Sequence, residues 1–279
     1  MENNELQVFG AIPSKPDVRD YVATTKEQVF PESFQLKLSP VKNQGFVGSC
    51  VAHALATVIE YFYQKEFNKM QEMSTGYIYG NRRMSSYKGI GMTTRDAIKT
   101  AQHYGSVPVE YFPINSEVPY IVDKFEAFAS ALKPIGENFK VHNYFRLSDV
   151  NAIKASIMEN GPVLCGIVWY DDIKIKNGIM HTNKVVSKKT SGHCMVIYGW
   201  DTNGWKVRNS WGKAWGDGGN FIIPYDFRLD EVWGIADDIS DTSLKLKKPF
   251  RSKFGVWLAK ILNAIAGFFY NLSHKNKNK

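Results

Sequence analysis

Cysteine is scarce in this chain, with three residues among 279. Three cysteines do not make the disulfide framework on which small secreted domains depend. The N-terminus also lacks the apolar run of a secretory signal. Both absences favour a reducing compartment, so we expect a cytoplasmic protein.

Several other classes of site lack their usual signals. No Cys/His spacing matches a zinc site, and no glycine-rich loop is placed to cradle a phosphate. Asp217-Gly218 is typical of a hairpin turn before a strand rather than of a calcium loop. No internal repeat or low-complexity tract is present. We therefore expect no cofactor and no metal.

Acidic residues are absent from the C-terminal tail. Residues 243–279 carry nine Lys or Arg and no Asp or Glu, whereas the whole chain has a net charge of +8. Residues 1–242 therefore carry 8 − 9 = −1. The basic character of this chain belongs to the tail alone.

Within the tail, residues 254–272 are apolar except for one narrow stripe of Lys260, Asn263, Gly267 and Asn271. A helix with such a stripe and basic flanks suits an anionic membrane surface, which would make this a peripheral membrane protein. Docking on the protein itself or on a partner is an alternative. Spanning is a third, although a central lysine costs about 2.5–3.5 kcal/mol. No stacking aromatics interleave with an exposed basic face, so we expect no nucleic-acid binding.

Cys50 stands at the start of a predicted amphipathic helix. Apolar residues recur at helical spacing and predict its buried face: Val51, Ala54, Leu55, Val58, Ile59 and Phe62. With Ser49 as N-cap, Cys50 falls in the first turn, where free amides and the helix dipole favour a thiolate. Gln44 lies upstream and can return its side-chain amide to the same place. A nucleophile with an oxyanion donor is the start of a mechanism, although a lone buried cysteine is more often a core residue.

A cysteine nucleophile needs a base, and the base needs an orienting group. Among six histidines, His193 differs because it begins an apolar strand after a glycine. A hairpin across residues 201–204 would bring Asn209 beside it. The Asn209 amide oxygen could then accept from the ring N–H, with Trp211 shielding that bond from water.

These segments resemble the papain-like cysteine peptidases. Residues 41–50 are similar to that family's run from oxyanion Gln to nucleophile, 192–200 to its His strand, and 209–219 to its Asn-Ser-Trp-Gly block. Asn160–Val163 and Gly89–Tyr104 resemble two connecting segments, and the matches span about residues 31–235. The resemblance implies Cys50 as nucleophile, His193 as general base and acid, Asn209 as orienter, and Gln44 with the Cys50 amide as oxyanion hole.

The sequence departs from the family pattern just before the nucleophile. Val47 stands where relatives carry a half-cystine that staples the catalytic helix. This departure suggests a branch in bacteria or their viruses, which residues 16–21 resemble too.

The resemblance also implies substrate contacts. Gly91 would offer backbone hydrogen bonds to an extended peptide, and Trp211 would flank the leaving-group side. Met92, Gly166 and Cys194 would line the main side-chain pocket. The small Gly166 and Cys194 suggest room for a bulky apolar side chain.

The expected fold class is α+β, a papain-like two-lobed fold with the active cleft between the lobes. Residues 31–242 would form the peptidase domain, with a helical lobe at about 31–135 and an antiparallel β-barrel-like lobe at about 136–242. Helices are predicted at about 49–67, 94–104, 121–132 and 148–160, and strands at about 162–170, 193–200, 204–210 and 219–224. Residues 1–30 form an N-terminal arm that either covers the cleft or drapes over the surface. Residues 243–279 form the basic amphipathic tail.

The predicted function is hydrolysis of peptide bonds through a thioester acyl-enzyme, with a polypeptide as substrate. An endopeptidase is favoured. An exopeptidase, amidase or peptide ligase on the same fold is the first alternative. A membrane-tethered binding module with an inert site is the second.

Overall fold

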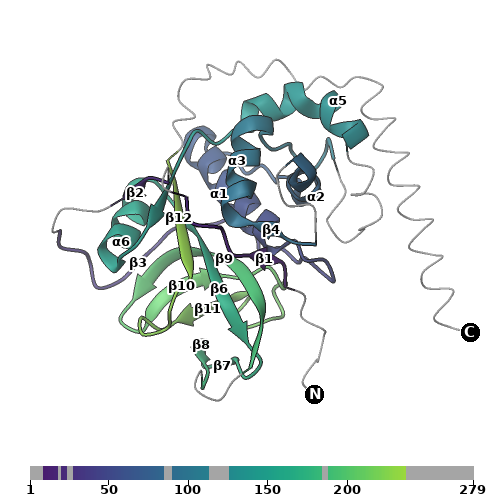
Figure 1. Ribbon diagram of the computed structural model, residues 1–279. Helices are drawn as coiled ribbons and strands as arrows, with labels where there is room; N and C mark the ends of the chain where they lie inside the picture. Colours follow the sequence, from purple (N-terminus) through teal and green to yellow (C-terminus); the bar gives the residue numbers. More distant parts are fainter. Residues whose placement is uncertain are drawn as a thin grey trace, which may run out of the picture.

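The computed structural model describes residues 9–17, 20–23, 28–84, 90–112, 126–183 and 188–236. Four of its helices gather on one side of the molecule (Figure 1): α1 (Cys50–Phe67), α2 (Thr75–Gly80), α3 (Thr94–Tyr104) and α5 (Glu126–Gly136). The sheet lies on the other side, with α6 (Val150–Glu159) packed against it. Short 3-10 turns follow α2 and α5, at Asn81–Met84 and Glu137–Phe139.

The centre of the sheet is an antiparallel run of five strands in the order β12, β6, β9, β10, β11. Their bounds are Glu231–Ala236, Val163–Tyr170, Lys189–Asp201, Gly204–Arg208 and Asn220–Ile223. At one edge β5 (Asn143–Leu147) and β2 (Val22–Ala23) extend it, and at the other β8 (Ile179–His181) and β7 (Lys174–Lys176). No pairing among the described strands joins these two edges.

Three two-residue strands lie off this path. They are β1 (Ala11–Ile12), β3 (Phe34–Gln35) and β4 (Met92–Thr93). β1 pairs with both β4 and β9, and so connects the helical side of the molecule to the sheet. This bridge passes directly over the start of α1.

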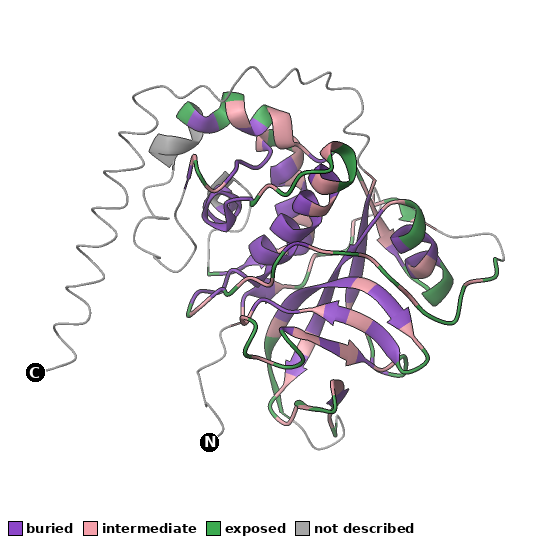
Figure 2. Cartoon of the chain, turned by 180° about the vertical axis from the view of Figure 1, so that it is seen from behind, coloured by how far each residue is buried: buried purple, intermediate pink, exposed green. Residues whose placement is uncertain are grey.

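α1 is buried around most of its circumference, as the purple ribbon in Figure 2 shows. The predicted apolar face is confirmed, because Val51, Leu55 and Val58 are each fully buried. Ser49 occupies the N-cap position, but its hydroxyl makes no capping hydrogen bond and instead contacts the Val47 carbonyl and the His53 ring. The amides of the first turn therefore remain available to other groups.

The predicted α+β fold class is confirmed. The helices predicted at 49–67, 94–104 and 148–160 and the four strands of the second half form where expected, within a few residues. For the helix predicted at 121–132, residues 121–125 lie outside the described part, and α5 runs on to Gly136 through Pro134. None of the described helices is long and apolar enough to cross a membrane. The tail from residue 237 onward, including the helix predicted over 254–272, lies outside the described residues.

Candidate active site

Cys50 opens α1 with its thiol turned toward strand β9. The backbone amide of Cys194, the residue after His193, hydrogen-bonds the Cys50 sulfur. Cys50 is 0% exposed, and all three cysteines are free thiols. The structure thus brings the predicted nucleophile to the strand that carries the predicted base.

His193 and Asn209 come together across the predicted hairpin. His193 Nε2 lies 2.8 Å from Asn209 Oδ1, so the asparagine oxygen can accept the ring proton and fix the tautomer. The Trp211 ring stacks on the imidazole at 4.6 Å between centroids. His193 Nδ1 has no hydrogen-bond partner among the described residues, and is therefore the nitrogen left for the thiol.

Gln44 is fully buried beside the start of α1. Its Nε2 donates to the Val47 carbonyl at 2.9 Å, and its Oε1 accepts from Ser210 Oγ at 2.6 Å. The Ser210 hydroxyl therefore orients the Gln44 amide so that its N–H groups face the start of the helix. Sequence reasoning missed this role of Ser210, although the residue stands between Asn209 and Trp211 in the motif.

Residues Phe9–Ile12, which we call the arm segment, lie over Cys50. Ala11 pairs with Met92 on one side and Gly192 on the other, and the Gly10 carbonyl accepts from the Met92 amide at 2.8 Å. Farther along the arm, Arg95 holds Asp20 at 2.8 Å.

Glycines make room for the arm segment. A Cβ at Gly91 would lie 2.3 Å from the Gly10 carbonyl oxygen, and one at Gly192 would lie 2.1 Å from that of Ala11. Gly91 also has φ +92°, which disfavours other residues. Gly10 itself would place a Cβ 1.9 Å from the Gly48 carbonyl oxygen. Residue 10 must therefore be glycine for the arm segment to pass Gly48.

Burial decides the protonation of the two reactive groups. Loss of solvent raises the pKa of Cys50 to about 11, although the amides of Cys194 and Gly10 oppose the shift. Burial also lowers the pKa of His193 to about 4, although the hydrogen bond that its ring donates to Asn209 opposes the shift. At neutral pH the covered site therefore holds a thiol and a neutral imidazole. The thiolate expected from the helix start is not the covered state, because desolvation outweighs the local amides.

The structure differs from the predicted substrate contacts in two places. The Gly91 amide donates to the Tyr79 hydroxyl at 3.1 Å, so the next amide, that of Met92, is the one offered to an extended chain. Gly166 and Cys194 are neighbours across β6 and β9.

The room expected beside Gly166 is occupied by Glu231. A Cβ on Gly166 would meet Glu231 Cγ at 2.8 Å. The Glu231 carboxylate accepts from Thr94 Oγ1 at 2.7 Å and from Trp233 Nε1 at 3.0 Å. This wall of the pocket is therefore acidic rather than open and apolar. No nearby sequence motif predicts Glu231 in this pocket, because Glu231 lies on β12, far along the chain from Gly166.

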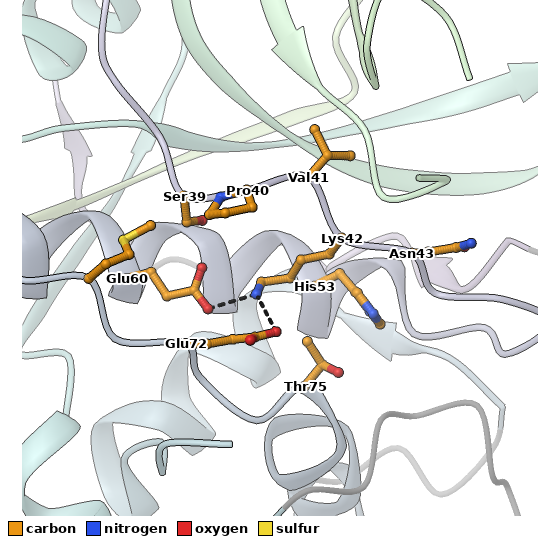
Figure 3. A pocket seen from close by; sticks show the side chains of 10 residues that line it. Ser39, Pro40, Val41, Lys42, Asn43, His53, Glu60, Glu72 and Thr75 are labelled. Carbon is orange, nitrogen blue, oxygen red and sulfur yellow. Dashed lines mark ion pairs between the residues drawn. The ribbon is translucent and has the colours of Figure 1, made fainter. Parts of the chain in front are cut away.

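A separate hollow of about 410 Å³ lies along the outer face of α1 (Figure 3). Lys42 reaches into it and pairs with Glu60 at 2.8 Å and Glu72 at 3.6 Å. Glu60 also accepts from the Met73 amide at 2.7 Å and is fully buried, whereas the Glu72 side chain is 64% exposed. The two carboxylates on one lysine thus differ in burial.

We expect Glu60→Ala to lower the free energy of unfolding by about 3–5 kcal/mol, because it leaves Lys42 buried beside a single exposed partner. Glu72→Ala is the matched control and should cost less than about 1 kcal/mol. Urea denaturation of both variants measures the difference. Equal losses would show that Lys42 and Glu60 contribute no more than a surface pair.

An α+β fold with a cysteine at a helix start, beside the strand that carries a His–Asn pair, is the arrangement expected of the class of thiol hydrolases. Comparison with known proteins gives the family. The model described as papain family cysteine protease matches residues 30–240. The chain belongs to this family, and it is a peptide-bond hydrolase acting on polypeptides.

Individual relatives agree. An uncharacterised peptidase C1-like protein of Acanthamoeba polyphaga mimivirus is 28% identical over 80% of this chain and 83% of its own length. Cysteine proteinase 3 of Entamoeba histolytica is 26% identical over 88% of this chain and 82% of its own. Among solved structures, xylellain, a cysteine protease from Xylella fastidiosa, superposes with a TM-score of 0.72 at 24% identity, over 82% of this chain and 96% of its own. The last match supports the fold.

Proposed function

We infer that this chain is an endopeptidase that cleaves through Cys50, His193 and Asn209 and is covered by its own N-terminal arm. The hydrogen bond of 2.8 Å between His193 and Asn209, on the strand that faces Cys50, is the observation that carries this proposal. In the open site, the Cys50 sulfur attacks the scissile carbonyl and forms a tetrahedral oxyanion. Gln44 and the Cys50 amide stabilise that oxyanion, at about 3 kcal/mol for each donor.

His193 carries the protons of this reaction. It takes the thiol proton and delivers it to the leaving amine as the C–N bond breaks and the thioester forms. Water, deprotonated by the same imidazole, then attacks the thioester and releases the thiol. Asn209 keeps the ring oriented through both steps.

The path of the arm favours an endopeptidase. The arm passes from Phe9, beside His193, to Ile12, beside Thr93, so that described residues of the arm lie on both sides of Cys50. A polypeptide can therefore extend past both sides of Cys50, whereas an exopeptidase needs one side blocked. This favours internal cleavage over the exopeptidase alternative.

The direction of the arm explains how it would escape cleavage. A substrate places its acyl part beside Met92 and its leaving amine beside His193. The arm segment runs the other way, with Phe9 beside His193 and Ala11 beside Met92. In this direction the nitrogen of the arm's peptide bond over Cys50 lies toward Met92. It is therefore not placed to accept the proton of His193 as a leaving amine would.

An epoxide thiol reagent tests the assignment. Wild-type protein and the Gly10→Val variant, in which the arm cannot pass Gly48, are treated and digested, and the modified peptides are identified by mass spectrometry. We expect one equivalent on Cys50 and none on Cys165, with loss of peptide hydrolysis in step with labelling. Hydrolysis that survives complete modification of Cys50 would contradict the mechanism.

A further inference from the structure

We propose that the hollow of about 410 Å³ along the outer face of α1 binds a small organic molecule that carries a guanidinium group on an apolar chain. Lys42, Glu60, Glu72 and Thr75 line this hollow, which we call the α1 hollow (Figure 3). Its described lining includes none of the residues assigned to catalysis, so the inference goes beyond the proposed peptidase function. The volume falls within the range of known small-molecule sites.

The charges that line the α1 hollow do not balance. Lys42 carries one positive charge and meets the carboxylates of Glu60 and Glu72 at 2.8 Å and 3.6 Å. His53 adds no charge at neutral pH, because burial lowers its pKa to about 4. With both carboxylates ionised, the described lining therefore has one negative charge in excess. A bound cation would neutralise it, and charges away from water are stable only when they are paired.

Buried polar atoms of the α1 hollow also lack partners. Glu60 is 0% exposed, and its Oε1 accepts from Lys42 and from the Met73 amide. Its Oε2 has no hydrogen-bond partner among the described residues, and neither has Oγ1 of Thr75, which is 3% exposed. The Ser39 hydroxyl lies near the Glu60 carboxylate, but it too finds no partner at hydrogen-bond geometry in the described part of the chain. Because an unpaired buried polar atom is costly, a ligand that donates to these oxygens would stabilise the folded protein.

These free oxygens favour a guanidinium group over an ammonium group. A guanidinium is planar, presents five N–H donors and is weakly hydrated, whereas an ammonium has three donors and is strongly hydrated. Donors are wanted at Glu60 Oε2 and Thr75 Oγ1, and the Glu72 carboxylate, with its side chain 64% exposed, can close on the outer side. Val41 and Met70 also line the hollow and give apolar surface for the attached chain.

Hydrogen bonds hold the walls of the α1 hollow in place. The Lys42 carbonyl accepts from the Gly212 amide at 3.0 Å, which fixes the segment that carries the lysine. Ser74 Oγ accepts from the Tyr77 amide at 3.1 Å, which fixes the turn that carries Thr75. A site that is ordered before binding loses little affinity to ordering when the ligand arrives.

The probe for this site is n-butylguanidinium, titrated into the full-length wild-type protein at pH 7 and followed by calorimetry. We expect a dissociation constant of about 1 mM or below. The uncharged isostere n-butylurea should bind at least about tenfold more weakly, and n-butylammonium about fivefold more weakly. Equal binding of the urea would show that the apolar chain alone is held, and equal binding of the ammonium would show that only charge is recognised. Either result, or no binding of the guanidinium, would overturn the proposal.

Variants locate the binding. Thr75→Val removes one acceptor and should weaken n-butylguanidinium binding at least about fivefold. The same change should leave the unfolding temperature equal or higher, because it removes a buried hydroxyl that has no partner among the described residues. Glu72→Gln removes one charge and should weaken binding about threefold.

Glu159→Gln, at an exposed carboxylate that ends α6, is the matched control and should bind as the wild type does. No substrate is turned over in these titrations, so failure of the proposed peptidase function would not change their outcome. Wild-type affinity in Thr75→Val or in Glu72→Gln would place the guanidinium outside the α1 hollow and overturn the proposal.

Discussion

Replacing Cys50 with alanine is expected to lower kcat for peptide hydrolysis by at least about 10⁴-fold. The change removes the atom that forms the thioester and leaves only binding and the oxyanion donors Gln44 and the residue-50 amide. The fold should persist, because Cys50 lies in the first turn of α1 and alanine has the higher helix propensity. Cleavage of a fluorogenic peptide in the Gly10→Val background measures kcat, and circular dichroism measures the fold.

Cys165→Ala is the matched control. Cys165 is equally buried, in β6, and burial raises its pKa as well, but it has no place in the proposed machinery. This variant should lose about 1–2 kcal/mol of stability through the cavity left by sulfur and keep its activity. Activity within tenfold of the parent in Cys50→Ala would exclude Cys50 as nucleophile.

The parts of the site that could be predicted are those specified by local spacing. The 3-4-3 pattern after Cys50 predicts a helix, and the order Gly192, His193, then Asn209 after a hairpin turn predicts a His–Asn contact. Both are present in the structure, the second at 2.8 Å. Each depends on residues within about twenty positions of one another, so hydrophobic period and turn chemistry are sufficient.

The rest depends on contacts between distant segments. β1 has two residues and no periodic pattern, and its position follows only from glycines at 48, 91 and 192 that belong to three separate segments. Glu231 reaches the substrate pocket from the last described strand. The same arm covers Cys50. Its burial raises the pKa of the thiol, which reverses the effect expected from the helix start. No window of sequence contains these pairings.

Gly10→Val is expected to raise the rate of Cys50 alkylation at pH 7 by at least about 100-fold. Any side chain at position 10 collides with the Gly48 carbonyl, so the arm segment must leave its place over the thiol. In the covered state pH 7 is below the Cys50 pKa of about 11 and above the His193 pKa of about 4, so both groups are neutral. Water in the opened site lowers the first pKa and raises the second, and both changes favour the reactive thiolate–imidazolium pair.

The pH dependence distinguishes this mechanism from simple loosening of the fold. The ultraviolet absorbance of the thiolate should appear in Gly10→Val below pH 7, and in the wild type only as the pH approaches the covered pKa of about 11. Val29→Ala, at a residue that is 97% exposed, controls for a substitution elsewhere in the N-terminal part and should behave as wild type. If Gly10→Val raises the alkylation rate without a thiolate signal near neutral pH, then the arm only blocks access, and the ionisation of Cys50 is set by its other neighbours, the amides of α1 and Cys194.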